Sequence, residues 1–287
     1  MIGTNSILGC LQISRSRRVK LQNSARHIEC PWFCKCLQQL ILFLRKQDGI
    51  HVFNDCQEVR DIMSKRKANL DDGCSPELVV GAEFDGVLEI PIIKPPDKIA
   101  IPSGITPFTK RKRAVGTDDA IGFFEKDPAF AEVLINPEAY VDDFLRFRYL
   151  FPVDCSMYRD APLAVQVTNL YRSRAIGSFY QRRGANVYTL IRWGNEYTYT
   201  KKYFPERIAF LGAPKRSALC IGTYGCVHSR RDKYYFKAGL DAMLETLEPV
   251  LVLVYGSMPD KIFGDYLAYT TFVPFTDWTK RAHGGDA

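Results

Sequence analysis

The sequence predicts an α/β protein whose largely parallel sheet is built from successive strand-and-helix units. Strand patterns begin at residues 149, 187, 218, 250 and 271, mostly about 30 to 40 residues apart, which is the length of a βαβ unit. The strand expected at residues 250–255 is continuous and apolar, as a strand covered on both faces should be. Because five or six such units follow one another without a glycine-rich dinucleotide fingerprint, we favour a barrel-like (TIM-like) sheet over an open doubly wound sheet.

The first elements are less regular than the later ones. Residues 87–93 are apolar and β-branched enough for a strand, although an internal proline confines that strand to an edge or a bulge. Residues 94–113 have the composition of a long loop. Helical spacing of apolar residues is expected from about residue 118 to residue 145. Pro128 and Pro137 should break this helix into short pieces.

The later helices are read from their ends and their apolar spacing. Asp160 can cap a helix that has Pro162 in its first turn. That helix should stop at Gly184, since glycine suits the left-handed position that follows a helix. Residues 232–247 place apolar side chains at helical spacing, and a short helix at residues 260–266 precedes the last strand.

Charge is unevenly distributed along the chain and indicates two parts. The formal net charge is +7, but residues 1–75 hold 12 Lys and Arg against 7 Asp and Glu, which leaves 27 of 39 and 25 of 32 for the remainder. We expect a poorly structured or non-native extension over residues 1–62 and a single α/β domain over residues 63–287, with Met63 as a candidate start. A nearly neutral domain gives little support for a nucleic-acid partner.

The cysteines and the apolar runs indicate the compartment. Six of the nine cysteines fall in the first quarter of the chain, which is not the spacing of a disulfide framework. No stretch resembles a secretory signal or reaches the ~20 apolar residues that span a bilayer. We therefore expect a cytoplasmic protein without a membrane segment. Metal ligation is not expected either, because His27, Cys30, Cys34 and Cys36 match neither zinc nor iron–sulfur spacing.

Polar and aromatic side chains follow the expected strands. In parallel α/β architectures ligands bind at the carboxyl ends of the strands. Arginines can bind an anion there, carboxylates can act as acids or bases, and aromatic faces can stack on a ligand. The strand ends therefore predict a site for an anionic or nucleotide-like ligand, with the candidates Asp154, Tyr158, Arg159, Arg192, Trp193, Thr223 and Tyr255.

The same side chains also have structural interpretations. Arg159 and Arg192 can form structural ion pairs with Asp154 or Glu196, and the aromatic residues can be packing residues. Gly-rich turns at residues 222–225 and 256–257 match no phosphate-binding fingerprint. The sequence thus predicts where a ligand would bind. It does not decide whether these side chains bind the ligand or only stabilise the fold.

Several short motifs resemble those of a known family. In chain order they are residues 84–93 (FDGVLEIPII), 154–162 (DCSMYRDAP), 169–177 (NLYRSRAIG), 191–194 (IRWG), 221–226 (IGTYGC) and 254–256 (VYG). Together they resemble the domain-of-unknown-function family 4417, whose members occur in bacteria and in phages or other mobile elements. The resemblance runs from about residue 63 to the end and supports Met63 as the start. It implies no reaction, cofactor or catalytic residue.

Two function hypotheses follow. The first is an enzyme-like α/β domain that binds an anionic or nucleotide-like ligand at its strand ends. The alternative is a non-catalytic nucleic-acid-binding accessory protein of a phage or mobile element, motivated by the basic run at residues 110–113. No catalytic residue is assigned, since Cys226 and His228 lie too close in sequence for favourable activation of a nucleophile. The near-neutral domain favours the first hypothesis.

Overall fold

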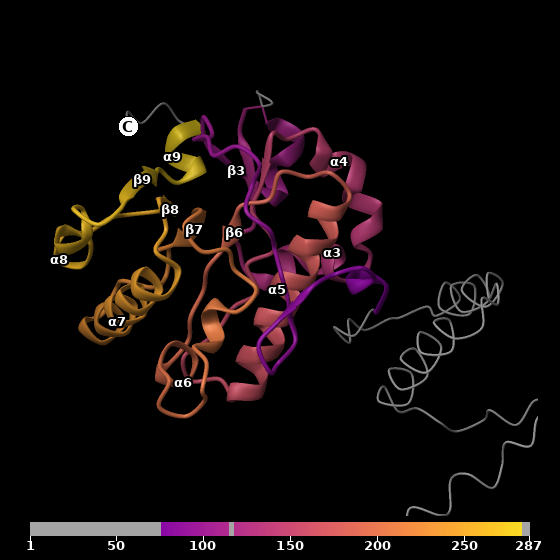
Figure 1. Cartoon of the computed structure of the whole chain (residues 1–287). Coiled ribbons are helices and arrows are strands. Elements are labelled where there is room, and N and C mark those ends of the chain that lie inside the picture. Colours follow the sequence, from indigo (N-terminus) through magenta and orange to yellow (C-terminus); the bar gives the residue numbers. More distant parts are fainter. Residues whose placement is uncertain (1–75, 115–117, 283–287) are drawn as a thin grey trace, which may run out of the picture. The chain divides into compact units, whose positions relative to one another are not determined.

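The computed structural model describes residues 76–114 and 118–282, which belong to one compact unit, Ala68–Ala287 (Figure 1). The extension expected over residues 1–62, its cysteines and the candidate start at Met63 lie outside the described residues. The described part has a mixed α/β fold with parallel sheets, as predicted. Within it, no helix combines the length and the apolar character that crossing a membrane requires.

A short hairpin precedes the main sheet. After η2 (Pro76–Val79), β1 (Phe84–Asp85) pairs antiparallel with β2 (Ile90–Pro91). The strand expected over residues 87–93 is therefore much shorter than predicted. Glu89 explains this, because its φ of 50° lies in the left-handed region and interrupts the extended backbone.

Seven parallel strands of the described chain follow in sequence order. One ladder contains β3 (Ile105–Pro107), β4 (Ala120–Gly122) and β5 (Tyr149–Leu150). The other contains β6 (Thr189–Leu190), β7 (Ala218–Gly222), β8 (Leu251–Tyr255) and β9 (Thr271–Phe275). A parallel bridge between Leu150 and Val187 joins the two ladders. The described strands show no pairing of β9 with β3, so they do not form a closed barrel.

The predictions for the first two of these strands were wrong. β3 lies in the expected loop, and β4 lies where a helix was expected. Three-residue strands are too short to show an alternating pattern, so the sequence carries little signal for them. Asp119 accepts a hydrogen bond from Thr106 Oγ1 at 2.7 Å and thereby joins the two strands.

Short helices connect β4 to β5, and the expected breaks at proline are confirmed. Pro128 lies in the first turn of η4 (Asp127–Phe130) and Pro137 in that of η5 (Pro137–Tyr140). Each is followed by a single short helix, α3 (Ala131–Ile135) and α4 (Val141–Leu145) respectively. The remaining short elements are η3 (Phe108–Arg113), α6 (Glu196–Tyr199), η6 (Ile208–Phe210), α8 (Asp260–Phe263), η7 (Gly264–Tyr266) and α9 (Trp278–Ala282).

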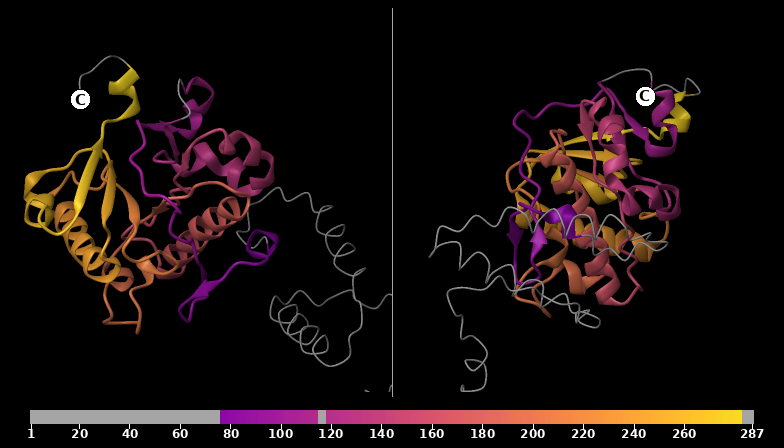
Figure 2. Two further views of the ribbon diagram at one scale, coloured as in Figure 1. Left: turned by 45° about the horizontal axis from the view of Figure 1, so that its top comes forward. Right: turned by 90° about the vertical axis from the view of Figure 1, so that its right-hand side faces the viewer.

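The two long helices, α5 (Leu163–Arg182) and α7 (Arg230–Leu247), lie on the same side of the strands (Figure 2, left). α5 ends as predicted, since Gly184 adopts a φ of 96°. Its start differs from the prediction, because Pro162 and not Asp160 is the N-cap. α7 begins with a capping box in which Ser229 and Asp232 exchange hydrogen bonds.

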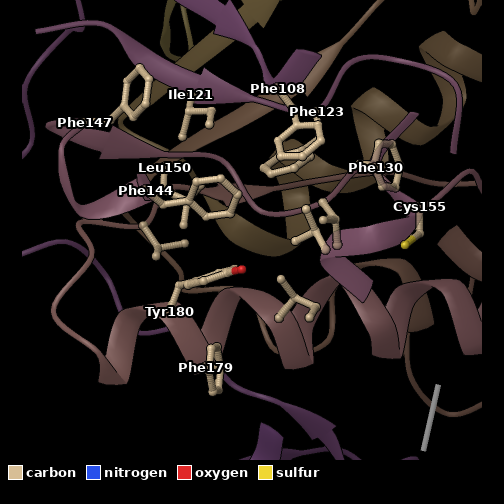
Figure 3. Close-up of a cluster of buried hydrophobic side chains, with 14 of the residues drawn as sticks. Phe108, Ile121, Phe123, Phe130, Phe144, Phe147, Leu150, Cys155, Phe179 and Tyr180 are labelled. Carbon is tan, nitrogen blue, oxygen red and sulfur yellow. The ribbon is translucent and has the colours of Figure 1, made fainter. Parts of the chain in front are cut away.

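Aromatic side chains fill the core between α5 and the strands β4 and β5 (Figure 3). Phe108 stacks on Phe123 with ring centroids 5.2 Å apart. Phe144 meets Tyr180 of α5 edge to face at 5.0 Å. Aromatic pairs of this geometry contribute about 0.5–1.5 kcal/mol beyond the burial of their area. This cluster therefore fixes α5 against the strands.

The opposite face of the strands has its own core. Side chains from all seven parallel strands meet in one buried cluster, which includes Ile105 of β3, Tyr188 just before β6 and Phe275 of β9. The hydroxyl of Tyr188 accepts from the backbone N–H of Ala100 and donates to its carbonyl, both at 2.7 Å. Residues near Ala100 therefore cover part of this face.

Arg174 of α5 is buried, with 1% of its surface exposed, and donates to three backbone carbonyls. Its Nη1 lies 2.7 Å from the oxygen of Leu190, and its Nε lies 3.0 Å from that of Leu211. A longer bond of 3.5 Å joins Nη2 to Ala209. Burial lowers the pKa of the Arg174 guanidinium, an effect that Asp85 opposes. Arg174 thus connects α5 to the end of β6 and to the η6 turn.

Replacing Arg174 by Ala should lower the free energy of unfolding by about 3 kcal/mol, since it opens a cavity and leaves buried carbonyls without donors. Urea denaturation followed by circular dichroism measures this loss. Arg183→Ala is the matched control, because Arg183 follows the same helix and pairs with Glu138 at the surface. Its loss should stay below about 1 kcal/mol. Equal losses in the two variants would contradict the structural role of Arg174.

Candidate functional site

A pocket of about 410 Å³ lies at the carboxyl ends of β4, β5, β6 and β7. Because parallel strands end at the same edge of a sheet, segments far apart in sequence meet there. The lining consists of residues 124–126 after β4, Asp154 and residues 156–160 after β5, residues 191–194 after β6, Gly222 and residues 224–226 at the end of β7, and Asp232, Tyr235 and Phe236 of α7. Residues that follow four neighbouring strands thus line one pocket.

Arg192 and Asp154 form an ion pair deep in this pocket. The guanidinium contacts both carboxylate oxygens: Nε lies 2.7 Å from Oδ1, and Nη2 donates to Oδ2. Asp154 is 4% exposed and Arg192 21%. The remaining group, Nη1, lies 3.0 Å from Sγ of Cys226 and 3.4 Å from the carbonyl of Gly222. The pair therefore joins the ends of three neighbouring strands.

The electrostatics of Arg192 follow from this pairing. Burial alone would lower the pKa of Arg192, but the attraction of Asp154 and the contact with Cys226 outweigh burial and raise it. Arg192 is thus held in its charged form, and Asp154 is the charge that compensates it inside the protein. The sequence left open whether Arg192 forms a structural ion pair, and the structure shows that it does, with Asp154.

Arg159 makes a second ion pair, with Asp232 of α7. Nη1 of Arg159 lies 3.0 Å from Oδ1, and the guanidinium lies over the ring of Tyr235, 5.0 Å from its centroid. Hydrogen bonds from Ser229 and from Arg159 hold the pKa of Asp232 well below its usual range. Arg159 therefore pairs with neither Asp154 nor Glu196, the partners considered from the sequence.

Aromatic side chains supply much of the remaining lining. Trp193 packs on Phe236 with ring centroids 5.0 Å apart, and it lies so close to Gly239 that any Cβ there would overlap its indole. Tyr158 and Tyr224 are 63% and 71% exposed. The pocket thus combines a packed aromatic residue with two tyrosines that are largely exposed to solvent.

The structure brings five of the seven predicted residues together and separates two. Asp154, Tyr158, Arg159, Arg192 and Trp193 all line the pocket. Thr223 is buried and donates through its hydroxyl to the carbonyl of Ser257 at 2.8 Å. Tyr255 is also buried, and its ring stacks on Phe124 at 4.5 Å. Tyr255 therefore supports a lining residue without reaching the pocket itself.

Sequence reasoning missed two groups of lining residues. Residues 124–126 were overlooked because β4 was taken for part of a helix. Asp232 and Tyr235 were overlooked because they belong to α7, whereas the sequence prediction considered only residues that follow a strand. Which turns of a helix reach a strand end depends on how the helix crosses the sheet, a property that its sequence does not encode locally.

The basic run at residues 110–113 lies in η3 and is partly structural. Nε of Arg111 lies 2.7 Å from Asp143, and its guanidinium lies 4.0 Å from the centroid of Phe108. Lys112 and Arg113 are exposed. In the described residues, no group of three or more His, Cys, Asp or Glu side chains could hold a metal ion.

The fold and the pocket together define an α/β protein with a strand-end pocket in the size range of small-molecule sites. The chain belongs to the family described as "Domain of unknown function (DUF4417)", whose model matches residues 82–275. The family resemblance of the motifs is therefore confirmed.

Two phage proteins are among the relatives. The chain is 29% identical to the Gene 1 protein of Mycobacterium phage D29 over 173 residues, which are 59% of this chain and 61% of that protein. It is 27% identical to the Gene 1 protein of Mycobacterium phage L5 over 179 residues, which are 61% of this chain and 74% of that protein. The match thus spans less than two thirds of the D29 protein. No solved structure matches the chain.

Replacing Asp154 by Ala should lower the free energy of unfolding by about 3 kcal/mol, because Arg192 is left without its carboxylate. A double-mutant cycle with Arg192→Ala should give a coupling of more than about 1 kcal/mol in urea denaturation.

The control cycle uses Asp118 and Arg148, whose ion pair at 3.0 Å has side chains 61% and 53% exposed. Its coupling should be about 0.5 kcal/mol or less. A coupling between Asp154 and Arg192 as small as this would show that their pairing does not stabilise the domain.

Proposed function

We propose that the strand-end pocket binds the base of a nucleotide-like ligand. The observation that carries this proposal is the combination of exposed tyrosines with paired charges in one pocket. Tyr158 and Tyr224 present exposed rings, while Arg192 and Arg159 are each paired with a carboxylate. Such a pocket offers stacking surfaces and hydrogen-bonding groups with little net charge.

The charge balance favours a base over a bare anion. Four carboxylates line the pocket against three cationic side chains, and two of these cations are bound in ion pairs. An isolated anion would have to compete with carboxylates for the arginines. A nucleobase carries both donors and acceptors on its edge, and the lining offers both kinds of partner. We therefore narrow the expected ligand from an anionic molecule to a nucleotide-like one.

Arg159 has a hydrogen-bond donor that no protein group uses among the described residues. Its Nη1 is occupied by Asp232, but its Nε is buried and has no hydrogen-bond partner among the described residues. The side chain is 30% exposed and lines the pocket. A small turn of the side chain on ligand binding would bring this donor to a carbonyl of a base or an oxygen of a sugar. Arg159 is thus the expected polar contact of the ligand.

Three of the four carboxylates in the pocket accept hydrogen bonds from protein groups, which favours a role in binding over proton transfer. Asp154 accepts from Arg192, and Asp232 accepts from Ser229 and Arg159. Glu125 accepts from the backbone N–H of Thr109 at 3.1 Å and from its hydroxyl. A general acid at neutral pH needs a raised pKa, whereas that of Asp232 is lowered. The proposal therefore concerns recognition of a ligand and assigns no reaction.

We also infer a barrel-like curvature of the sheet, which would favour the same location. Inward side chains of all seven parallel strands meet in one cluster, as they do when a sheet curves around its own core. α9 contacts β3, and Arg281 of α9 pairs with Asp119 beside β4. We infer an incomplete barrel in which α9 covers the edge of β3. Ligands of barrel proteins bind at the carboxyl ends of the strands.

Thermal-shift screening of the full chain with mononucleotides and nucleosides tests the proposal. At least one of these compounds should raise the melting temperature, and calorimetry should then give its affinity. Tyr158→Ala and Tyr224→Ala should each weaken binding about fivefold or more, because stacking on one base contributes ~1–3 kcal/mol.

Tyr269→Ala is the matched control, because Tyr269 is 79% exposed and lies just before β9, at the opposite end of the strands. It should leave the affinity unchanged. No melting shift with any base-containing compound, or equal losses in all three tyrosine variants, would sink the proposal.

A further inference from the structure

Positive charge accumulates on two elements that contact each other, α6 and α7, and α7 also lines the pocket. The side chains concerned, called the α6–α7 rim below, are Lys201 and Lys202 after α6 and Arg230, Arg231 and Lys233 in the first turn of α7, and all five are exposed. Within the described residues, no carboxylate lies within ion-pair distance of Arg230 or Lys233. Cations at a helix N-terminus are unfavourable for the helix itself, so the fold does not require them there.

Exposed tyrosines lie among these charges. The described residues include six exposed tyrosines. Tyr269 lies away from the pocket and the rim. The other five lie at the pocket or the rim, and they are Tyr158, Tyr197, Tyr203, Tyr224 and Tyr234. Tyr197 and Tyr203 contact each other with centroids 4.1 Å apart, and Lys202 lies 5.1 Å from the ring of Tyr203. Exposed aromatic rings between cations are typical of surfaces that bind single-stranded nucleic acid.

Tyr235 connects the rim with the pocket. Arg159, which lines the pocket, lies 5.0 Å from the centroid of the Tyr235 ring, and Arg231 of the rim lies 5.8 Å from it. Asp232, between Arg231 and Lys233 in sequence, also lines the pocket. A ligand in the pocket is therefore close to Arg231 and to the first turn of α7, which also carries Arg230 and Lys233.

We propose that the α6–α7 rim binds the backbone of single-stranded nucleic acid and that one base of this strand enters the pocket. The inference rests on the proposed base-binding pocket and names the molecule to which the base belongs. The pocket offers stacking and hydrogen bonding but little net positive charge, and the rim supplies the cations that phosphates need. A duplex keeps its bases stacked inside, so it cannot use the pocket or the tyrosines without unpairing.

Fluorescence anisotropy of the full chain with a labelled thymidine oligonucleotide of about 12 residues tests the inference, since sites of this kind cover ~4–16 nucleotides. The double variant Arg230→Ala, Lys233→Ala should bind the strand about tenfold more weakly. Its slope of log affinity against log salt should be shallower by about 1.4, because each lost phosphate contact on a single strand removes ~0.7. Its affinity for the mononucleotide should stay unchanged.

The matched control is Lys98→Ala, Lys215→Ala, which removes the same charge from two exposed positions away from the rim. It should leave both affinities and the salt slope unchanged. The control is needed because residues 1–75 carry 12 Lys and Arg, which could bind nucleic acid nonspecifically.

The outcomes separate the two proposals. If the mononucleotide binds but the strand binds no tighter, or if the two double variants lose strand affinity equally, the inference about the rim is overturned and the pocket proposal stands. If the rim variant weakens strand binding while Tyr158→Ala and Tyr224→Ala do not, the entry of a base into the pocket is overturned. Equal affinity for a duplex of the same length contradicts the preference for single strands.

Discussion

The buried guanidinium of Arg174 is the contact on which the rest of the domain depends. The strands β3 to β6 have two or three residues each, so strand pairing leaves backbone carbonyls at their ends in need of other donors. Arg174 supplies such donors from α5 to Leu190 at the end of β6 and to the carbonyls of Ala209 and Leu211. Because Arg192 follows Leu190 by two residues, the same contact also positions the segment that carries the pocket ion pair.

Charges inside the pocket and charges beside it obey different rules. A cation removed from water needs either a compensating charge or several acceptors: Arg192 is bound to Asp154, and Arg174 is bound to backbone carbonyls. Arg230 and Lys233 remain hydrated, so they need no partner in the protein. This division suits a ligand with an aromatic base and an external phosphate backbone. The pocket and the rim both fall within residues 82–275, the region that defines the family.

Much of the fold is predictable because its signals are local. The strand β8 and the helix α7 were located from apolar runs and spacing alone, and both agree with the structure to within two residues at each end. The regular repeat of such units also predicted a parallel sheet. β3 and β4 were not predictable in this way, since three residues show no periodicity. β4 is a strand because Ala120 and Ile121 pair with β3 on one side and with β5 on the other, and β3 is a strand because it pairs with β4.

The sequence by itself determined which residues follow β5 to β8 and therefore gather at one edge of the sheet, where the candidate site lies, because parallel strands end at the same edge. Only the tertiary structure decided the contacts within it: Arg192 pairs with Asp154, Arg159 pairs with Asp232 of a later helix, and Thr223 and Tyr255 turn away from the pocket. The physical reason is the distance along the chain over which each effect acts. Propensity and periodicity act over a few neighbouring residues, whereas ion pairs and side-chain direction depend on strand register and on how distant segments approach one another.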